Sequence, residues 1–430
     1  MIIAIILAVF AVLILLEVPV AFAMGAAALL ALLAKPELSF SIVSQSTILG
    51  INSFVYIAIP MFILAGSLME HGGISRRLVA LAKALVGSVR GGLGMSVVVS
   101  EMFFSGISGS TVADVSAVSG MLLPGMKRAG YKPEYAVSIV SAASAMGILI
   151  PPCNLMVVLG AIANVSVAAL FFAGFIPALV LALVLMATLF IQATQQGLPA
   201  GEKTSWRRLR AALLDSLIAL GMPVIVFGGI LGGVATPTEA ASLAVFYALI
   251  VAVFIYREIR LAELPRILLD VTVVSGTVML LIGLASILSY LFAVEQLPQS
   301  VAGAMLSMHV SPWLFLIITM VIFITLGSLL EGIPAALIFV PILLPVAEQL
   351  NVDALHFLII VVAAMGIGTF LPPAGMGLLI ACGIGKVSMT RATKPMMVFV
   401  WVLSAGILIL IFVPWLTTVL PVTLLDYRAL

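Results

Sequence analysis

Long apolar segments with almost no charge follow one another along the whole chain, and this pattern limits the folds available to it. Only 8% of the 430 residues are Asp, Glu, Lys or Arg, whereas a water-soluble domain carries about 25%. The hydrocarbon core of a bilayer admits only helices or closed barrels, because backbone polar groups find no water there. Since the apolar runs do not alternate with polar residues, we predict an all-α polytopic membrane protein.

The same composition argues against several classes of protein. A cytosolic enzyme, a disordered chain or a nucleic-acid binder needs far more charge, and a net charge of +2 indicates no polyanionic partner. The two cysteines, Cys153 and Cys382, lie in apolar stretches. They give no disulfide framework and no metal-ligand spacing, so we expect small buried residues.

The first apolar stretch, Ile2–Leu33, is interrupted only by Glu17 and Pro19. It has no basic n-region and no small-residue cleavage site, so it is not expected to be a cleaved signal peptide. About 20 residues cross a bilayer. The stretch is therefore either one long tilted span or two short helices hinged at Glu17–Pro19.

Lysine and arginine gather in a few connections, which the positive-inside rule places on the cytoplasmic side. These clusters are Arg76–Arg90, Lys127–Lys132, Lys203–Arg210, Arg257–Arg266 and Lys386–Lys394. The connections near Glu295–His309 and Glu348–Asp353 contain neither residue and should face outward.

Two segments then begin and end on the same side of the membrane. Gly91–Met126 lies between two cytoplasmic clusters and is too short for two spans, which need about 40 residues. Ser311–Ala347 lies between two outward connections. We predict two re-entrant hairpins that dip into the bilayer from opposite faces.

The hairpin regions match without gaps at an offset of 221 residues, which predicts an internal repeat. Leu122-Leu123-Pro124 recurs as Leu343-Leu344-Pro345, and Pro151-Pro152 recurs as Pro372-Pro373. Each proline removes a backbone donor and disfavours the α conformation of the residue before it, so the pairs predict broken helices rather than plain kinks. Inverted repeats with broken helices are typical of secondary transporters, whose ligand site lies near the membrane midplane.

Polar residues at the first hairpin tip are candidate ligands. The hydroxyls of Ser105, Ser108 and Ser110 and exposed carbonyls could coordinate Na⁺, and a helix that begins after Ser110 could receive a carboxylate. A small-residue packing face is the alternative. Asp114 favours the functional interpretation, because an ionisable residue at this depth is costly.

The second tip carries Glu331 and Gly332, and Glu331 stands at the offset position of Ser110. A partly hydrated glutamate near a turn is the alternative there. Asn154 and Thr369 add side-chain oxygens beside the two proline pairs.

Three further segments have weaker signals. Thr236, Thr238 and Glu239 predict a capped helix start, and as secondary candidates an ion-linked turn. Ile74–Val89 is amphipathic, and Leu297–Met308 precedes the second hairpin as Ile74–Val89 precedes the first. These two segments predict horizontal arms, or simple surface helices.

Five stretches together resemble the large (M-type) permease subunit of tripartite ATP-independent periplasmic (TRAP) transporters. They are Val18–Phe22, Phe104–Asp114, Gly147–Pro152, Ala235–Ala240 and Gly368–Gly375. The resemblance implies an elevator-type fold and Na⁺-driven uptake of an organic acid, such as a C4-dicarboxylate, a sialic acid or another sugar acid. It also implies a bacterial inner-membrane location and two partners, a small four-helix membrane subunit and a periplasmic substrate-binding protein.

The resemblance also assigns site residues. It implies substrate binding at Ser108, Ser110, Asp114, Asn154, Glu331, Thr369 and Gly375. It implies Na⁺ near Ser105, Ser108, Ser110, Pro151 and Asn154, with Pro152 beside them, and near Glu331, Gly332, Thr369, Pro372 and Pro373. Glu331 stands where many relatives carry Asp, a difference that would change the cavity.

The implied organisation alternates scaffold with transport domain. We expect scaffold helices and the first arm in 1–90, the transport domain in 91–165 and 311–386, further scaffold with the second arm in 166–310, and a C-terminal span in 387–430.

Three other functions are alternatives to a TRAP permease. An intramembrane enzyme would need a Ser–His pair or an Asp dyad, and His71, His309 and His356 all lie away from Ser108 and Asp114. A channel would be built by oligomer symmetry rather than by internal inversion. A partner-independent Na⁺/dicarboxylate symporter of a related fold is the main alternative. The sequence does not name the acid.

Overall fold

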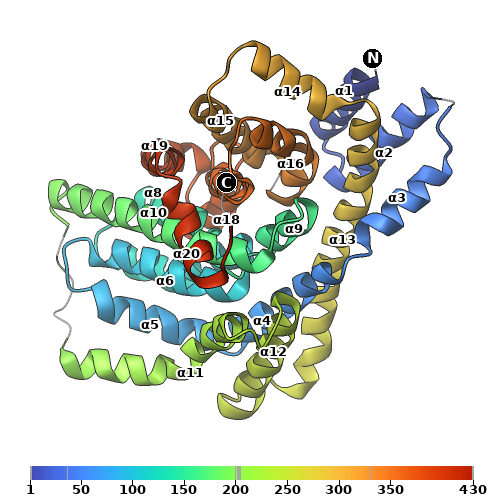
Figure 1. Ribbon diagram of the computed structural model, residues 1–430. Helices are drawn as coiled ribbons and strands as arrows, with labels where there is room; N and C mark the ends of the chain where they lie inside the picture. The colour runs from blue at the N-terminus through green and yellow to red at the C-terminus, as the bar shows by residue number, and fades with distance from the viewer. Residues whose placement is uncertain (1, 36, 199, 201–204, 331, 429–430) are drawn as a thin grey trace.

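The computed structural model describes residues 2–35, 37–198, 200, 205–330 and 332–428, and in this part of the chain helices dominate (Figure 1). Their bounds are α1 (Ile2–Leu15), α2 (Val20–Leu33), α3 (Ser41–Ile51), η1 (Phe54–Ile57), α4 (Ala58–His71), α5 (Ile74–Val86), α6 (Gly92–Ser108), α7 (Thr111–Arg128), α8 (Pro133–Gly147), α9 (Asn154–Ile162), α10 (Val167–Gln195), α11 (Trp206–Leu231), α12 (Pro237–Ile250), η2 (Val251–Ile255), η3 (Leu261–Glu263), α13 (Leu264–Val294), α14 (Leu297–Ser307), α15 (Pro312–Leu330), α16 (Gly332–Gln349), α17 (Ala354–Gly368), α18 (Met376–Gly385), α19 (Met389–Phe412) and α20 (Trp415–Leu425).

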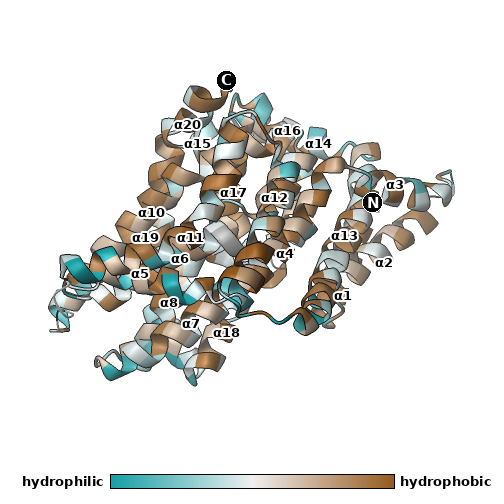
Figure 2. Ribbon diagram, turned by 90° about the horizontal axis from the view of Figure 1, so that it is seen from below, coloured by the Kyte–Doolittle hydropathy of each residue, from teal (hydrophilic) through white to brown (hydrophobic). Residues whose placement is uncertain are grey.

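Eight helical segments among the described residues are long and apolar enough to cross a membrane. Figure 2 shows helices that are largely hydrophobic, with hydrophilic residues gathered at their ends and in the connections. The predicted all-α polytopic membrane protein is therefore confirmed.

The N-terminal stretch is two helices rather than one long span. α1 ends at Leu15, Glu17 adopts a left-handed conformation with φ of +60°, and Pro19 stands immediately before α2. The two helices pack against each other, and α2 and α3 pack on the long helix α13. In Figures 1 and 2, α1–α3 lie on the outer side of α13, away from the remaining helices.

Two four-helix units repeat in the predicted positions. α6 and α7 form the first hairpin and α8 and α9 the first broken helix, while α15 to α18 repeat this order. In both units the hairpin helices pack on the first half of the broken helix. Each hairpin also packs on the broken helix of the other unit, through α7 with α18 and α16 with α9. The helices of the second hairpin are long enough to span, so its re-entrant depth stays a prediction.

Both predicted arms are helical. α5 packs on the first hairpin and on α11, and α14 packs on α16 and α13. α5 is fixed at its start by the guanidinium of Arg77, which lies 3.6 Å from the ring centroid of Tyr256. Nε of Arg77 is also 3.4 Å from Oδ1 of Asp215 on α11. α5 is therefore attached to α11 and to Tyr256, directly after η2, through charged and aromatic side chains.

Candidate functional site

The first hairpin tip is a tight glycine turn followed by a capped helix. α6 ends at Ser108, and Gly109 adopts φ of +63°, a conformation that other residues reach at a cost. The hydroxyl oxygen of Ser110 then accepts a hydrogen bond from the amide of Ala113, as an N-cap residue does. The predicted helix start after Ser110 is confirmed.

A buried hydrogen bond links the two helices of this hairpin. The hydroxyl of Ser105 on α6 donates to Oδ2 of Asp114 on α7 at 2.7 Å. Both side chains are buried, Asp114 with 2% of its surface exposed. An acidic side chain removed from water needs such partners, and α7 also directs the positive end of its dipole toward its first turn.

A second buried carboxyl group, which sequence reasoning missed, lies one helical turn before Ser105. Glu101 is fully buried, and its Oε1 accepts a hydrogen bond from the hydroxyl of Ser144 on α8. Its Oε2 has no hydrogen-bond partner among the described residues. The sequence does contain a signal for it. Glu101 is an acidic residue inside an apolar run, and an ionisable residue there is as costly as Asp114.

The hairpin tip touches the first helix break. Nδ2 of Asn154 donates to the carbonyl of Gly109 at 3.1 Å. A Cβ atom on Gly109 would lie 3.1 Å from the carbonyl oxygen of Pro152, and one on Gly106 would lie 3.4 Å from that of Pro151. Oδ1 of Asn154 is buried without a partner within the described residues. The structure thus brings together Ser105, Asp114, Asn154 and both carbonyls of the proline pair.

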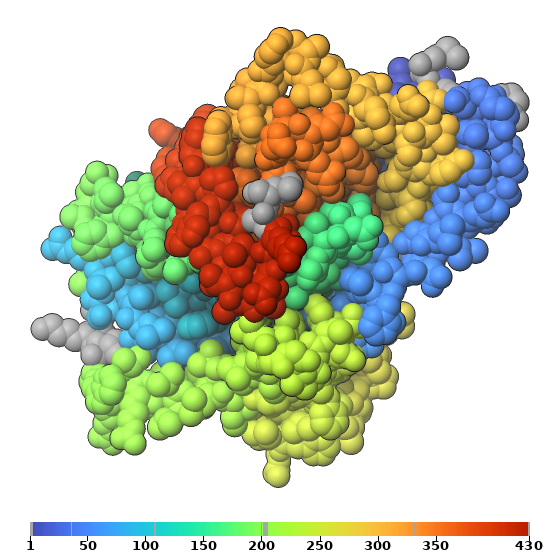
Figure 3. All heavy atoms as spheres, in the orientation of Figure 1, coloured from blue at the N-terminus to red at the C-terminus, as the bar shows by residue number. Residues whose placement is uncertain are grey.

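The second tip approaches the same place from the other unit. A Cβ atom on Gly332 would lie 3.7 Å from Cδ2 of Leu155, the residue after Asn154. Figure 3 shows the second hairpin in orange close to α9 in green. Glu331 and the side chain of Ser108 lie outside the described residues, so their predicted roles stay predictions.

The second break differs from the first in the hydrogen-bond partners of its oxygen atoms and in its burial. The hydroxyl of Thr369 donates to the carbonyl of Met365 in its own helix at 3.0 Å. Gly375 precedes α18, and the amide of Gly377 donates to the carbonyl of Thr369. Pro372 is partly buried and Pro373 exposed, whereas Pro151 and Pro152 are buried. Both proline pairs are joined by cis peptide bonds.

The two broken helices are held together at their centre. A Cβ atom on Gly366 of α17 would lie 2.2 Å from the carbonyl oxygen of Ala145 on α8. Only glycine allows this approach of the two backbones, which fixes the first break relative to the second.

The polar segment Thr236–Glu239 is a helix cap. The hydroxyl of Thr236 accepts from the amide of Glu239, while Oε2 of Glu239 accepts from the amide and the hydroxyl of Thr236. This reciprocal pair is a capping box at the start of α12. Thr238 is buried, and α12 packs mainly on α4 and α11. The capping prediction is confirmed, and an ion-linked role stays a prediction.

The donor set at the first tip and break suits a hard cation. It consists of serine hydroxyls, carboxylate oxygens, an amide oxygen and backbone carbonyls, which are ligands for cations such as Na⁺ rather than for soft metals. Among the described residues, no three His, Cys, Asp or Glu side chains converge as a metal cluster, and Cys153 and Cys382 are buried free thiols.

The profile of one protein family matches nearly the whole chain. Residues 7–416 match the family described as tripartite ATP-independent periplasmic transporter, DctM component.

Named relatives are similar over most of their length. The chain is 37% identical to the C4-dicarboxylate TRAP transporter large permease protein DctM of Pseudomonas aeruginosa, covering 86% of each chain. It is 32% identical to the sialic acid TRAP transporter large permease protein SiaM of Vibrio cholerae, over 95% of this chain and 96% of that one. It is 36% identical to the isethionate TRAP transporter permease protein DctMQ of Oleidesulfovibrio alaskensis, over 94% of this chain and 64% of that one.

Two solved transporters have a similar fold at low identity. The YdaH transporter of Alcanivorax borkumensis superposes with a TM-score of 0.56 at 14% identity, over 86% of each chain. The MtrF efflux pump of Neisseria gonorrhoeae superposes with a TM-score of 0.57 at 14% identity, over 86% of this chain and 83% of that one.

Proposed function

The chain belongs to the DctM component family of TRAP transporters and is a large permease subunit, and on that premise we propose that it performs Na⁺-coupled uptake of an organic acid by an elevator mechanism. The observation that carries this proposal is the contact between the first hairpin tip and the first break, where Asn154 meets Gly109. Buried oxygens of Asn154 and Glu101 without partners among the described residues supply unused acceptors there.

The substrate is an organic anion. The relatives named above are permeases for a C4-dicarboxylate, a sialic acid and isethionate, which share an acidic group. The N-terminus of α7 at Ser110 presents backbone donors and the positive end of a helix dipole to such a group. The second tip at Gly332 lies against Leu155, so an anion between the two tips would face both units.

Sodium is the co-transported cation. Ser105, Asp114, Asn154 and the carbonyls of Pro151 and Pro152 are the residues that would hold it at the first tip. Bound Na⁺ supplies positive charge beside the anionic substrate, which no lysine or arginine of this site provides among the described residues. Its binding would also hold the tip against the break, because tip and break each contribute ligands.

The moving part consists of the hairpins and broken helices, in 91–165 and 311–386. The close approach of Gly366 to Ala145 supports motion of both units as one body. The attachment of α5 through Arg77 supports a role of the remaining helices as the fixed scaffold. A helix bundle that slides as a unit would carry the site from one side of the membrane to the other.

Two partners complete the transporter in the bacterial inner membrane. They are a small four-helix membrane subunit and a periplasmic protein that delivers the substrate. The relative named DctMQ is longer than this chain, which spans 64% of it. Its extra length supports a second membrane part beside the large permease.

The test is uptake into proteoliposomes that contain this chain, the small subunit and the binding protein loaded with a candidate organic acid. We expect uptake that requires an inward Na⁺ gradient and collapses when K⁺ replaces Na⁺. Equal uptake on K⁺ alone would refute the Na⁺ coupling. Equal uptake by this chain without partners would favour the partner-independent symporter, and single-channel currents would favour a channel.

A further inference from the structure

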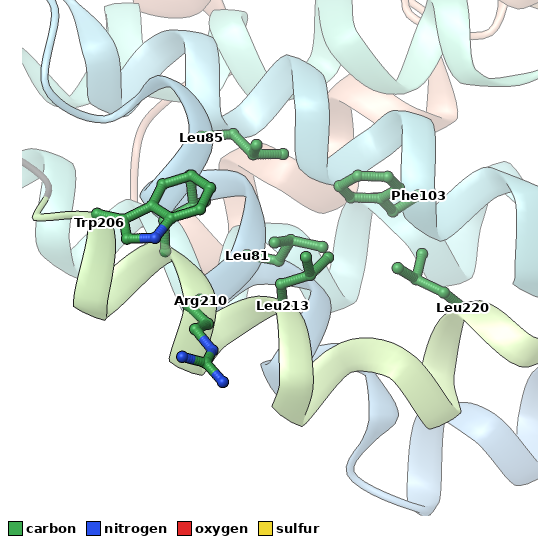
Figure 4. Close-up of a pocket in the computed structure, with 8 residues that line it drawn as sticks. Leu81, Leu85, Phe103, Trp206, Arg210, Leu213 and Leu220 are labelled. Carbon is green, nitrogen blue, oxygen red and sulfur yellow. The ribbon is translucent and has the colours of Figure 1, made fainter.

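An apolar cavity of about 290 Å³ opens between the first arm, the first hairpin and the scaffold (Figure 4). α5 contributes Leu81 and Leu85, α6 contributes Phe103, and α11 contributes residues from Trp206 to Leu220. The volume is at the lower end of the about 300–1,000 Å³ of ligand pockets. Arg210 is the one charged residue among the described residues that line it.

The lining separates into an apolar wall and a charged rim. In Figure 4, Leu213 of α11 faces Leu81 of α5, and the ring of Trp206 leans toward the same space. The guanidinium of Arg210 turns away from these apolar side chains. Leu85 and Leu213 are 47% and 44% exposed, so the wall is open to the outer surface of the helices. This shape fits an amphiphile with a hydrocarbon tail and a polar head.

The rim carries uncompensated positive charge. Arg210 forms no ion pair with any other described residue. Asp215, on the same helix, pairs with Arg77 instead. A tryptophan and an arginine near a helix start are typical of the membrane–water interface, and a basic residue there attracts anionic headgroups.

A second cavity provides a contrast. About 150 Å³ in volume, it lies between α4, α12 and α13 and is lined only by apolar residues, among them Leu64, Leu249 and Leu268. A hydrocarbon chain without a charged head group would fill it. The cavity at Arg210 differs by its charged rim, which selects for an anionic head.

We propose that the cavity between α5, α6 and α11 binds an anionic phospholipid, with one acyl chain along Leu81, Phe103 and Leu213 and the phosphate at Arg210. Because the three walls belong to the arm, the hairpin and the scaffold, a bound acyl chain packs on all three at once. The proposal concerns lipid binding and does not depend on the transported substrate or on Na⁺.

Native mass spectrometry of the purified chain tests it with phosphatidylglycerol and phosphatidylcholine of identical acyl chains. The wild-type chain is expected to bind phosphatidylglycerol more tightly. Arg210→Gln should lower that affinity about fivefold and lower phosphatidylcholine binding less, because the choline ammonium of phosphatidylcholine already offsets the charge of its phosphate. Leu213→Trp should weaken phosphatidylglycerol binding by filling the cavity.

Two variants are matched controls. Arg207→Gln removes the same charge outside the lining, and Leu214→Trp adds the same bulk at a neighbouring exposed leucine that does not line the cavity. Each should change the affinity by less than about twofold. A single peak in size-exclusion chromatography confirms that every variant folds.

Three results would overturn the proposal. The first is equal wild-type affinity for the two lipids. The second is an Arg207→Gln effect as large as that of Arg210→Gln, which would mean diffuse charge rather than a site. The third is cross-linking of a Leu85→Cys variant to the small membrane subunit in the assembled complex, because a protein would then cover the cavity.

Discussion

The first and second units of the repeat follow the same helical path, but their interiors differ in polarity. In the first unit Ser105 bonds to Asp114, and Ser144 bonds to Glu101. At the offset of 221 residues the second unit has Leu326, Ala335, Met365 and Ile322 in the places of Ser105, Asp114, Ser144 and Glu101. The backbone arrangement is duplicated, whereas the two buried acids Asp114 and Glu101 of the first unit have apolar residues at the matching positions of the second.

The two helix breaks also differ, both in burial and in their polar side chains. Pro151, Pro152 and Asn154 are buried, while Pro373 is exposed and Gly375 stands at the position of Asn154. If both units bind Na⁺, they must do so with different ligands. The first can use the side-chain oxygens of Asp114 and Asn154, whereas Glu331, the acid implied at the second tip, lies outside the described residues. Repeat symmetry therefore predicts where sites lie and not what they are made of.

Among the variants that test this difference between the two units, Asp114→Ala should have the largest effect. Asp114→Ala deletes the acceptor of Ser105 and a charged group, and we expect Na⁺-driven uptake to fall about 100-fold, because a hydrogen bond to a charged group is worth up to about 3 kcal/mol. Asp270→Ala, at an exposed position on α13, should leave uptake unchanged. Normal uptake by Asp114→Ala would reduce the first-unit network to a packing feature.

The second unit has apolar residues in the places of Glu101 and Ser144. Replacing these two residues should separate the contribution of Glu101 to stability from its contribution to transport. Ser144→Ala leaves Oε1 of the buried Glu101 without its donor and should cost about 1–3 kcal/mol, measured as a lower melting temperature. Replacing both partners, in Glu101→Met with Ser144→Ala, should restore the melting temperature, because no polar group is then left unpaired.

The same double variant should still transport about tenfold more slowly if the carboxyl group of Glu101 takes part in ion capture. Glu101→Gln, which keeps an acceptor for Ser144, is the control for packing. Full uptake by the double variant would show that the buried acid serves structure only.

The glycines at the two breaks should differ in their tolerance of a methyl group. A Cβ atom at Gly368 would lie 2.5 Å from the backbone oxygen of Ile324, whereas one at Gly147 would lie 2.2 Å from the hydroxyl of Ser105, a side chain that can rotate. Gly368→Ala should therefore destabilise by about 1–3 kcal/mol, and Gly147→Ala by less. Thermal unfolding in detergent measures both.

Gly120→Ala is the control for the glycine pair, because no heavy atom lies within 4 Å of the added Cβ atom. It should be neutral or stabilise the helix by up to about 1 kcal/mol. An equal loss in Gly147→Ala and Gly368→Ala would mean that the Ser105 hydroxyl is as rigid as the backbone.

The arms should show the smallest effects. Nη2 of Arg76 pairs with Oε2 of Glu258 at 2.9 Å in an exposed position, so Arg76→Gln should change stability by less than about 1 kcal/mol. Tyr256→Leu removes the ring under Arg77 and should cost about 0.5–1 kcal/mol. Melting temperatures in low and high salt test both, and an Arg76→Gln effect that persists in high salt would contradict a screened surface pair.

The sequence by itself determined the features that have local signals. Scarce charge set the helical membrane class, the proline pairs located both breaks, and the sequences around Ser110 and Thr236 marked helix starts. Such features depend on residues a few positions apart, where backbone sterics and capping act.

Only the tertiary structure decided which distant groups meet. Ser144 contacts Glu101 across 43 residues, Gly332 lies beside Leu155, and the N-terminal stretch forms two helices, α1 and α2, that pack against each other. It also decided that Pro151 and Pro152 are buried while Pro373 is exposed, and that α5, α6 and α11 line a common cavity. These outcomes follow from the packing of helix faces against each other, which no local periodicity in a single chain encodes.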